Sequence, residues 1–502
     1  MGPYPAKPPL SSAEARPTMA HYDLIIRNAD IATVGDRYRA DIGVKNGRIS
    51  AIAQDLEGSA TRELDAAGRL VTPGGVDGHC HFDQPTSDGS KFADDFETGT
   101  RSAACGGTTT VLPFALQQRG HSIQAAVDDY HRRAEGKACI DYAFHLIVAD
   151  ATKDVTQREL PQLIEKGYTS FKIYMTYDDL KLGDRQIIEV LATARRHGAM
   201  TMIHAENSDC IAWLTEQLLD AGLTAPRYHA ASRPMAVERE ATHRAIALAE
   251  LIDTPILIVH VSGREAVEQI HWARGRGLPI HAETCPQYLF LSAEDLGIDE
   301  NDPMHGARCI CSPPPRDKAN QQFIWNGLSS GLFTIVSSDH APFNMNGPDG
   351  KRVAGDGASF DRIPNGIPGV ETRLPLLMSE GVMAGRIDIH RFVELTATNP
   401  ARLYGLYPRK GTIAVGGDAD LVIWDQFAPG EEITIRNDML HHAADYTPYE
   451  GMKLRAWPAT TVSRGRLVWH DGRFDAAPGS GLFLPCLRPR APRDGNPLEK
   501  WL

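Results

Sequence analysis

The chain has 502 residues, and its 42% of hydrophobic and 23% of charged residues are ordinary values for a globular protein with a substantial core. Its net charge of −12 and its lack of a long basic block argue against a nucleic acid or an anionic membrane surface, which leaves small molecules as the expected partners. No uninterrupted apolar stretch approaches the roughly 20 residues needed to cross a bilayer, so no contact with a membrane is predicted.

The first residues and the cysteines bear on processing and compartment. Residues 1–20 are rich in Pro, Ala and Ser and lack the apolar centre of a secretory signal, so we interpret them as a flexible extension with Met19 as an alternative start. The 8 cysteines are scattered, without a C-x-x-C pair or a regular disulfide framework. A reducing, cytoplasmic compartment is therefore expected.

Two β-rich parts lie near opposite ends of the chain. Both consist of short, partly alternating apolar segments that are broken by Gly, Asn and Asp, a pattern typical of antiparallel strands. We therefore predict one small β-sandwich domain that is built from residues 21–73 and 409–478. The remaining residues, 479–502, begin with the apolar stretch GLFLPCL and are expected to form a tail that contacts another subunit.

The middle of the chain, residues 74–408, alternates apolar strand-like runs with amphipathic helical stretches. This alternation predicts an α/β fold, a (β/α)8 TIM barrel with insertions, although a doubly wound open sheet would produce a similar pattern. Helices are expected at 122–136, 184–198 and 263–277, each with a glycine at its C-terminal end. The eight expected strands are 74–82, 108–114, 141–148, 170–175, 200–206, 255–262, 278–285 and 333–340.

Six metal-ligand or acid-base side chains fall mostly late in these strands, at the rim where catalytic groups of a barrel gather. His79 and His81 are two residues apart on one strand, so both side chains point to the same face. Two imidazoles so placed can bind zinc without a rearrangement of the backbone. The other four are Lys172, His204, His260 and Asp339.

Each of these residues taken alone also has an ordinary structural explanation. A single histidine in a strand is more often a hydrogen-bonded core residue than a ligand, and Asp339 could cap a turn. The prediction therefore depends on all six lying on ordered strands. Five other histidines fall on helical or loop stretches and are interpreted as structural: His121, His131, His197, His229 and His271.

Lys172 lies inside the apolar run SFKIYM, where an unpaired ammonium group is costly. Four imidazoles and one carboxylate can serve two metal ions, but such a centre also needs a bridging anion, and an ammonium group has only donors. Reaction of the amine with carbon dioxide would give a carbamate, which is anionic and offers two oxygens. We therefore predict that Lys172 is carboxylated and bridges two metal ions.

A series of motifs runs along most of the chain. The motifs are, in order, GGVDGHCHFDQP, DDFETGTRSAACGGTTTV, FKIYMTY, HAEN, HVSG, ETCPQYL, SPPPR, SSDHAPF, IPNGIPGVETRLPLL and HHAADYTPYEGMKLRAWPATTVSRG. With these motifs the chain resembles the dihydropyrimidinases or hydantoinases, cyclic amidohydrolases of the amidohydrolase superfamily. The resemblance covers about residues 21–475.

The resemblance implies that a dihydropyrimidine or 5-substituted hydantoin is hydrolysed to an N-carbamoyl amino acid. It implies two Zn²⁺ per subunit: His79, His81 and Asp339 hold one, His204 and His260 hold the other, and carboxylated Lys172 bridges them. A metal-bound hydroxide would attack the ring carbonyl. Asp339 would act as general base and then as general acid.

Three further positions take a function only from the resemblance. Tyr177 matches a tyrosine that stabilises the oxyanion. Ser312 and Asn365 match residues that hold the N–H and C=O of the cyclic amide largely through backbone groups. Read alone, these are a rim aromatic and two turn residues. The chain departs from many family members in the loops after His81 and Tyr177, where Gln84, Thr86 and Lys181 predict a more polar or differently sized substrate.

Related activities remain alternatives. A dihydroorotase would carry an arginine soon after His81, where this chain has Phe82 and Asp83, and allantoinases usually lack a tyrosine at position 177. Cyclic imides remain open as substrates. Some relatives are non-catalytic scaffold proteins that have lost metal ligands, which this chain retains. The family is commonly tetrameric, so a homotetramer or homodimer is expected.

Overall fold

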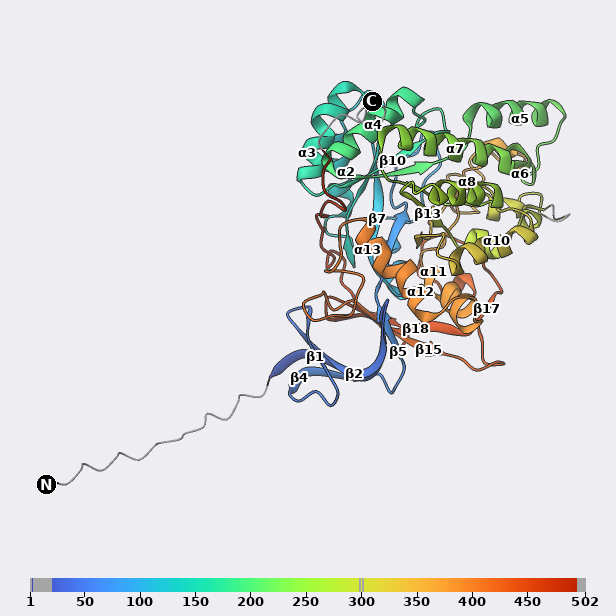
Figure 1. Cartoon of the computed structure of the whole chain (residues 1–502). Coiled ribbons are helices and arrows are strands. Elements are labelled where there is room, and N and C mark those ends of the chain that lie inside the picture. The colour runs from blue at the N-terminus through green and yellow to red at the C-terminus, as the bar shows by residue number, and fades with distance from the viewer. Residues whose placement is uncertain (1, 3–19, 298, 300–301, 494–502) are drawn as a thin grey trace.

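The computed structural model describes residues 2, 20–297, 299 and 302–493, so nearly all of the predicted extension at 1–20, including Met19, lies outside the described residues. A large barrel stands on a small β-domain, whose blue and orange-red strands lie below it in Figure 1. Within the described part of the chain, no helix is long and apolar enough to cross a membrane.

The barrel strands follow one another around the sheet in sequence order, with parallel pairing throughout. A doubly wound sheet would reverse that order at its centre, so the barrel prediction is confirmed. The strands are β6 (Gly75–Cys80), β7 (Thr108–Leu116), β9 (His145–Ile147), β10 (Ser170–Tyr174), β11 (Met200–His204), β12 (Ile256–Ile258), β13 (Ile280–Thr284) and β14 (Ile335–Val336).

The seam between the first and last barrel strands is narrow. β14 has only two residues, and no ladder joins it to β6. Instead, a single bridge pairs Cys80 with His340, and the His81 N–H donates to the His340 carbonyl over 2.7 Å. The barrel is therefore closed at the level of the predicted metal ligands.

The predicted third strand, 141–148, is divided. Its first part, β8 (Asp141–Tyr142), pairs with β7 on one side and with the C-terminal segment on the other, where Tyr142 bonds to Leu482 and Leu484. Only β9 continues around the barrel. The first part of the predicted strand thus pairs with a segment from far along the chain and does not continue around the barrel.

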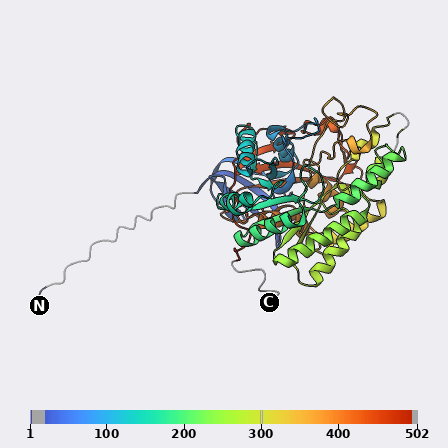
Figure 2. The same cartoon turned by 90° about the horizontal axis from the view of Figure 1, so that it is seen from above.

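Helices surround the strands, as the view from above shows for the cyan, green and yellow elements in Figure 2. The three helices predicted from periodicity are α2, α4 and α8. Asp95 and Ser122 cap the first turns of α1 and α2, and α4 ends at Gly198 in the left-handed conformation. The helices are α1 (Phe96–Cys105), α2 (Ile123–Ala134), α3 (Leu160–Glu165), α4 (Asp184–His197), α5 (Ser208–Asp220), α6 (Tyr228–Ser232), α7 (Met235–Ile252), α8 (Arg264–Gly275), α9 (Gln287–Phe290), α10 (Lys318–Ser329), α11 (Arg373–Leu376), α12 (Ile389–Val393) and α13 (Asn399–Leu403).

The small domain combines strands from both ends of the chain, as expected. β5 pairs with β15 in antiparallel fashion and so joins the N-terminal strands to the C-terminal ones. A separate ribbon consists of β16 (Ile433–Thr434) and β17 (Lys453–Leu454). The strands of the main sheet are β1 (His21–Ala32), β2 (Arg37–Lys45), β3 (Arg48–Ala53), β4 (Ser59–Asp65), β5 (Leu70–Pro73), β15 (Leu421–Gln426), β18 (Ala456–Ser463), β19 (Arg466–His470) and β20 (Arg473–Phe474).

The C-terminal segment lies against its own barrel as far as residue 493. Leu484 and Cys486 are buried there, and the Cys486 N–H donates to the Gly167 carbonyl. Much of the apolar stretch is thereby covered within the chain. Leu482 and Leu487 remain 47% and 69% exposed, so the predicted subunit contact would rest on these two side chains.

Candidate metal centre and active site

One cavity of about 1040 Å³ opens at the C-terminal rim of the barrel and collects nearly all of the predicted site residues. His79 is fully buried directly beside it. The functions assigned to these residues remain predictions, but the chain does bring them together. The predicted residues that line the cavity are His81, Lys172, Tyr177, His204, His260, Ser312, Asp339 and Asn365.

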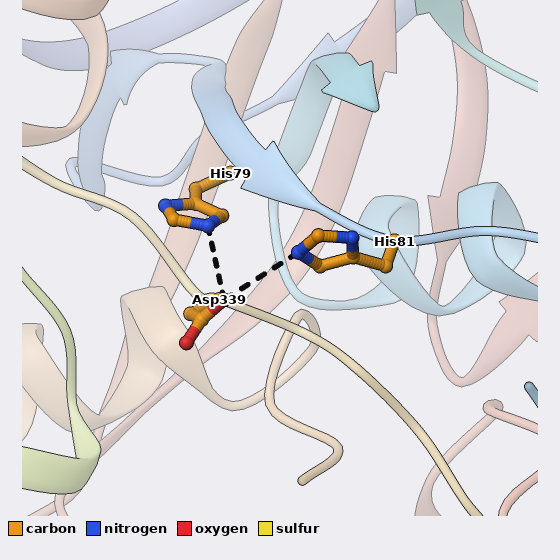
Figure 3. Close-up of side chains that lie close together, drawn as sticks. All are labelled: His79, His81 and Asp339. Atoms are coloured by element: carbon orange, nitrogen blue, oxygen red, sulfur yellow. Dashed lines mark ion pairs between the residues drawn. The ribbon is translucent and has the colours of Figure 1, made fainter. Parts of the chain in front are cut away.

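His79 and His81 project from the end of β6 toward Asp339, which follows β14 (Figure 3). Asp339 Oδ1 lies 3.0 Å from His79 Nε2 and 3.6 Å from His81 Nε2. Nitrogen and oxygen ligands that converge in this way suit a zinc ion, so the group could hold a metal. Burial alone would raise the pKa of Asp339, but the adjoining imidazoles hold it well below its usual value.

His204 and His260 form a second pair, with ring centroids 4.4 Å apart. Neither ring nitrogen of buried His260 has a hydrogen-bond partner among the described residues. Buried polar atoms are nearly always paired, and an unpaired imidazole is explained if it binds a metal.

Lys172 lies between these groups on β10. Its Nζ is 2.6 Å from His79 Nε2 and 4.3 Å from the centre of the Phe114 ring, and no ion pair with a carboxylate is formed within the described residues. Burial lowers the pKa of Lys172 to about 8. Two nitrogen groups that approach each other so closely fit a site that is completed by other atoms.

Three side chains orient the histidines from behind. Glu283 Oε1 lies 2.6 Å from His79 Nδ1, and Gln84 Oε1 lies 2.7 Å from His81 Nδ1, so both Nε2 atoms remain directed at Asp339. Glu206 Oε2 lies 2.8 Å from His204 Nε2. Such partners fix the orientation and raise the basicity of metal ligands. Sequence reasoning missed Glu206 and Glu283, although each is a carboxylate inside a buried stretch reading His-Ala-Glu, a signal like that of Lys172.

Strained backbone conformations coincide with the site. Tyr177, His260 and Asp339 have φ values of 69°, 38° and 49°, in the left-handed region that non-glycine residues avoid. Each such residue costs roughly 1–3 kcal/mol and persists where its surroundings impose it. The backbone turns immediately beyond the strands and directs these side chains across the cavity.

The substrate-binding candidates Tyr177, Ser312 and Asn365 form the substrate wall of the cavity. Tyr177 lies beside His204, with ring centroids 5.4 Å apart. The Arg233 guanidinium lies 5.6 Å from the centre of the Tyr177 ring and bonds to Glu206 over 2.8 Å. Burial raises the pKa of Tyr177, so its hydroxyl stays protonated and can donate. His229, which was predicted to be structural, is buried beside this wall, with Nε2 2.9 Å from the Cys311 carbonyl and 3.2 Å from Ser312 Oγ. Burial lowers the pKa of His229 to about 3 and keeps it neutral.

The side chains of Gln84, Thr86 and Lys181, which suggested a polar substrate, bond largely to other residues of the protein. Gln84 is engaged by His81, and the Thr86 hydroxyl donates to the Ser90 carbonyl. The Lys181 ammonium turns toward Ser208 and Asp178, at 3.1 and 2.7 Å. Most of these partners lie only three or four residues away in the sequence. Because the polar groups are engaged by them, the three side chains give less support to the expectation of a more polar substrate.

Comparison with known proteins agrees with this geometry. The Amidohydrolase family matches residues 70–468. The chain is 44% identical to the D-hydantoinase of Ralstonia pickettii, over 92% of this chain and 98% of the relative. The structure resembles that of the dihydropyrimidinase from Brevibacillus agri, with a TM-score of 0.89 and 40% identity over 92% of this chain and 98% of the other. It also resembles the L-hydantoinase (dihydropyrimidinase) from Arthrobacter aurescens, with a TM-score of 0.82 and 28% identity over 92% and 99% of the two chains.

Proposed function

Because the chain belongs to the amidohydrolase family, among the dihydropyrimidinases and hydantoinases, we propose that it opens the ring of a dihydropyrimidine or a 5-substituted hydantoin. Water adds to the ring carbonyl, the carbon–nitrogen bond breaks, and an N-carbamoyl amino acid results. The observation that carries this proposal is the convergence of four histidines, Lys172 and Asp339 at one cavity on the barrel rim.

We propose that this donor set holds two divalent metal ions. His79, His81 and Asp339 would hold one, and His204 and His260 the other, with Lys172 bridging them as a carbamate. The unpaired nitrogens of His260 and the lack of a carboxylate partner for Lys172 within the described residues support this assignment. Two zinc ions there would polarise the ring carbonyl and lower the pKa of a water molecule.

Residues of the protein carry out the other steps. Asp339 accepts the proton of the attacking water and passes it to the ring nitrogen that leaves. The Tyr177 hydroxyl donates to the oxygen on which negative charge develops. Ser312 and Asn365 hold the two ends of the cyclic amide, so the scissile bond stays against the metal centre.

A substrate panel together with metal analysis tests this proposal. The purified protein is expected to contain about two zinc ions per chain and to open dihydrouracil, dihydrothymine or substituted hydantoins. Allantoin and cyclic imides serve as comparison substrates, because preferential hydrolysis of either would assign a neighbouring activity. Well under one zinc per chain and no ring opening would contradict the proposal and would favour a non-catalytic relative.

A further inference from the structure

Among the described residues, a second buried lysine without a carboxylate partner lies close to Ser312 and Asn365. Lys351 is fully buried in the segment between β14 and the short 3₁₀ helix Phe360–Arg362. Its Nζ donates to the Ile310 carbonyl over 2.9 Å and to the Pro364 carbonyl over 2.6 Å, and no ion pair is formed within the described residues. Burial of an ammonium group without a carboxylate partner is costly, so the two carbonyl bonds are the main contacts that hold Lys351 in this position.

The two carbonyls belong to separate segments that carry the substrate-binding candidates. Ile310 lies two residues before Ser312, and Pro364 immediately precedes Asn365. The Gly366 N–H also donates to the Ile310 carbonyl, over 3.0 Å. Lys351 is thus a bridge between the segment of Ser312 and the segment of Asn365.

We propose that Lys351 is a positioning residue that sets the separation of Ser312 and Asn365, and so fits their backbone groups to the two ends of a cyclic amide. This inference rests on the proposed function. Backbone groups cannot adjust by changing rotamer, so their spacing must come from bonds such as these. Burial lowers the pKa of Lys351 to about 7, but the amine and the ammonium both keep enough donors for the two carbonyls.

The expected effect is on substrate binding. Contacts to the amide exist both before and during the reaction, and loss of such uniform binding raises KM while kcat changes little. A general loss of folded protein would instead lower the apparent kcat and leave KM unchanged. The two constants therefore separate a positioning function from a merely structural one.

The test compares the holoenzymes of wild type, Lys351→Met and Arg352→Met on the best cyclic amide. Methionine has a similar length but no donor, and Arg352 is a matched control because it bonds to Met345 and Asp356 rather than to the substrate wall. We expect Lys351→Met to raise KM by about tenfold with kcat within about threefold, and Arg352→Met to change KM by less than about twofold. An unchanged KM with a lower melting temperature, or a fall in kcat alone, would overturn the inference.

A second variant keeps the test informative if Lys351→Met fails to fold. Lys351→Gln keeps one amide that can reach one of the two carbonyls, and it is expected to raise KM less than Lys351→Met does. Failure of both variants to fold would overturn the inference, because the residue would then act in folding rather than in positioning. A wild type that opens no ring overturns the proposed function as well, whereas an active wild type with an unchanged variant KM overturns this inference alone.

Discussion

Lys172 and Lys410 are both buried, but their surroundings shift their pKa values in opposite directions. Lys410 Nζ lies within 3.0 Å of Asp141, Asp418 and Asp420, and these carboxylates raise its pKa above the usual value. Lys172 faces His79 and an aromatic ring, and burial lowers its pKa to about 8. Only a neutral amine attacks carbon dioxide, so the environment of Lys172 favours carbamate formation and that of Lys410 opposes it.

Replacement of Lys172 tests the carbamate directly. Lys172→Ala is expected to lose most of its metal and activity, because the bridging anion is gone. Short carboxylic acids such as acetate should restore part of the activity, since they place two oxygens in the space that is left. Zinc content and hydrolysis rate would be measured with and without acid, and the wild type should gain nothing from it. Full metal and activity in the variant would contradict the assignment.

Glu283 gives a second prediction at the level of a residue. Glu283→Gln keeps the shape of the side chain but removes the charge that lies 2.6 Å from His79 Nδ1. We expect zinc affinity or kcat to fall about 10- to 100-fold, as for other partners that orient metal ligands. A chelator titration measures the affinity. Glu268→Gln, which loses only an exposed pair with Arg264, is the control and should bind zinc normally.

At the scale of elements, one arginine holds the loop beyond β10 in place at the mouth of the cavity. Arg119 Nε donates to the Asp179 carbonyl over 2.9 Å, and its Nη2 donates to the Lys181 carbonyl over 2.6 Å. Ser87, from the loop after β6, donates to the Asp179 carboxylate over 2.8 Å. The loops after β6 and β10, which face the ring substituent under the proposed function, are thus fastened to each other.

Arg119→Ala should loosen this loop without disturbing the metal centre. We expect KM to rise severalfold for hydantoins with bulky substituents, and to change by less than about twofold for unsubstituted dihydrouracil. The comparison needs only steady-state kinetics on the two substrates. An equal change for both would show that the loop does not contact the substituent.

At the scale of the whole molecule, Lys410 and its three aspartates connect the barrel to the small domain. Asp141 lies on β8 of the barrel, whereas Asp418 and Asp420 lead into β15 of the small domain. Lys410→Met would leave three carboxylates without their buried cation. The free energy of unfolding is expected to fall by about 3–5 kcal/mol, as measured by urea denaturation. Arg409→Met, which removes a partly exposed pair with Asp418, should cost less than about 1 kcal/mol.

What the sequence could predict depended on how local each signal is. The barrel strands are contiguous apolar runs, and the ligands end or follow them, so both could be recognised along the chain. Gln84 and Thr86 bond to residues only three and four positions away, and Lys181 bonds both to nearby Asp178 and to Ser208 from another segment. The division of the third strand depends on Leu482 and Leu484, far along the chain. Contacts between segments far apart in the sequence have no local pattern, and contacts within a loop depend on a backbone conformation that residue types alone do not specify, so neither kind was predicted.

The narrow seam between β6 and β14 has a consequence for the stability and degradation of the protein. His79 and His81 stand on one side of the seam and Asp339 on the other, where one bridge joins Cys80 to His340. A cation bound by residues from both sides would add to the stability of the folded chain. Chains without metal would then unfold more readily and be degraded faster. The supply of metal would then affect how much of the protein a cell keeps, as well as how active it is.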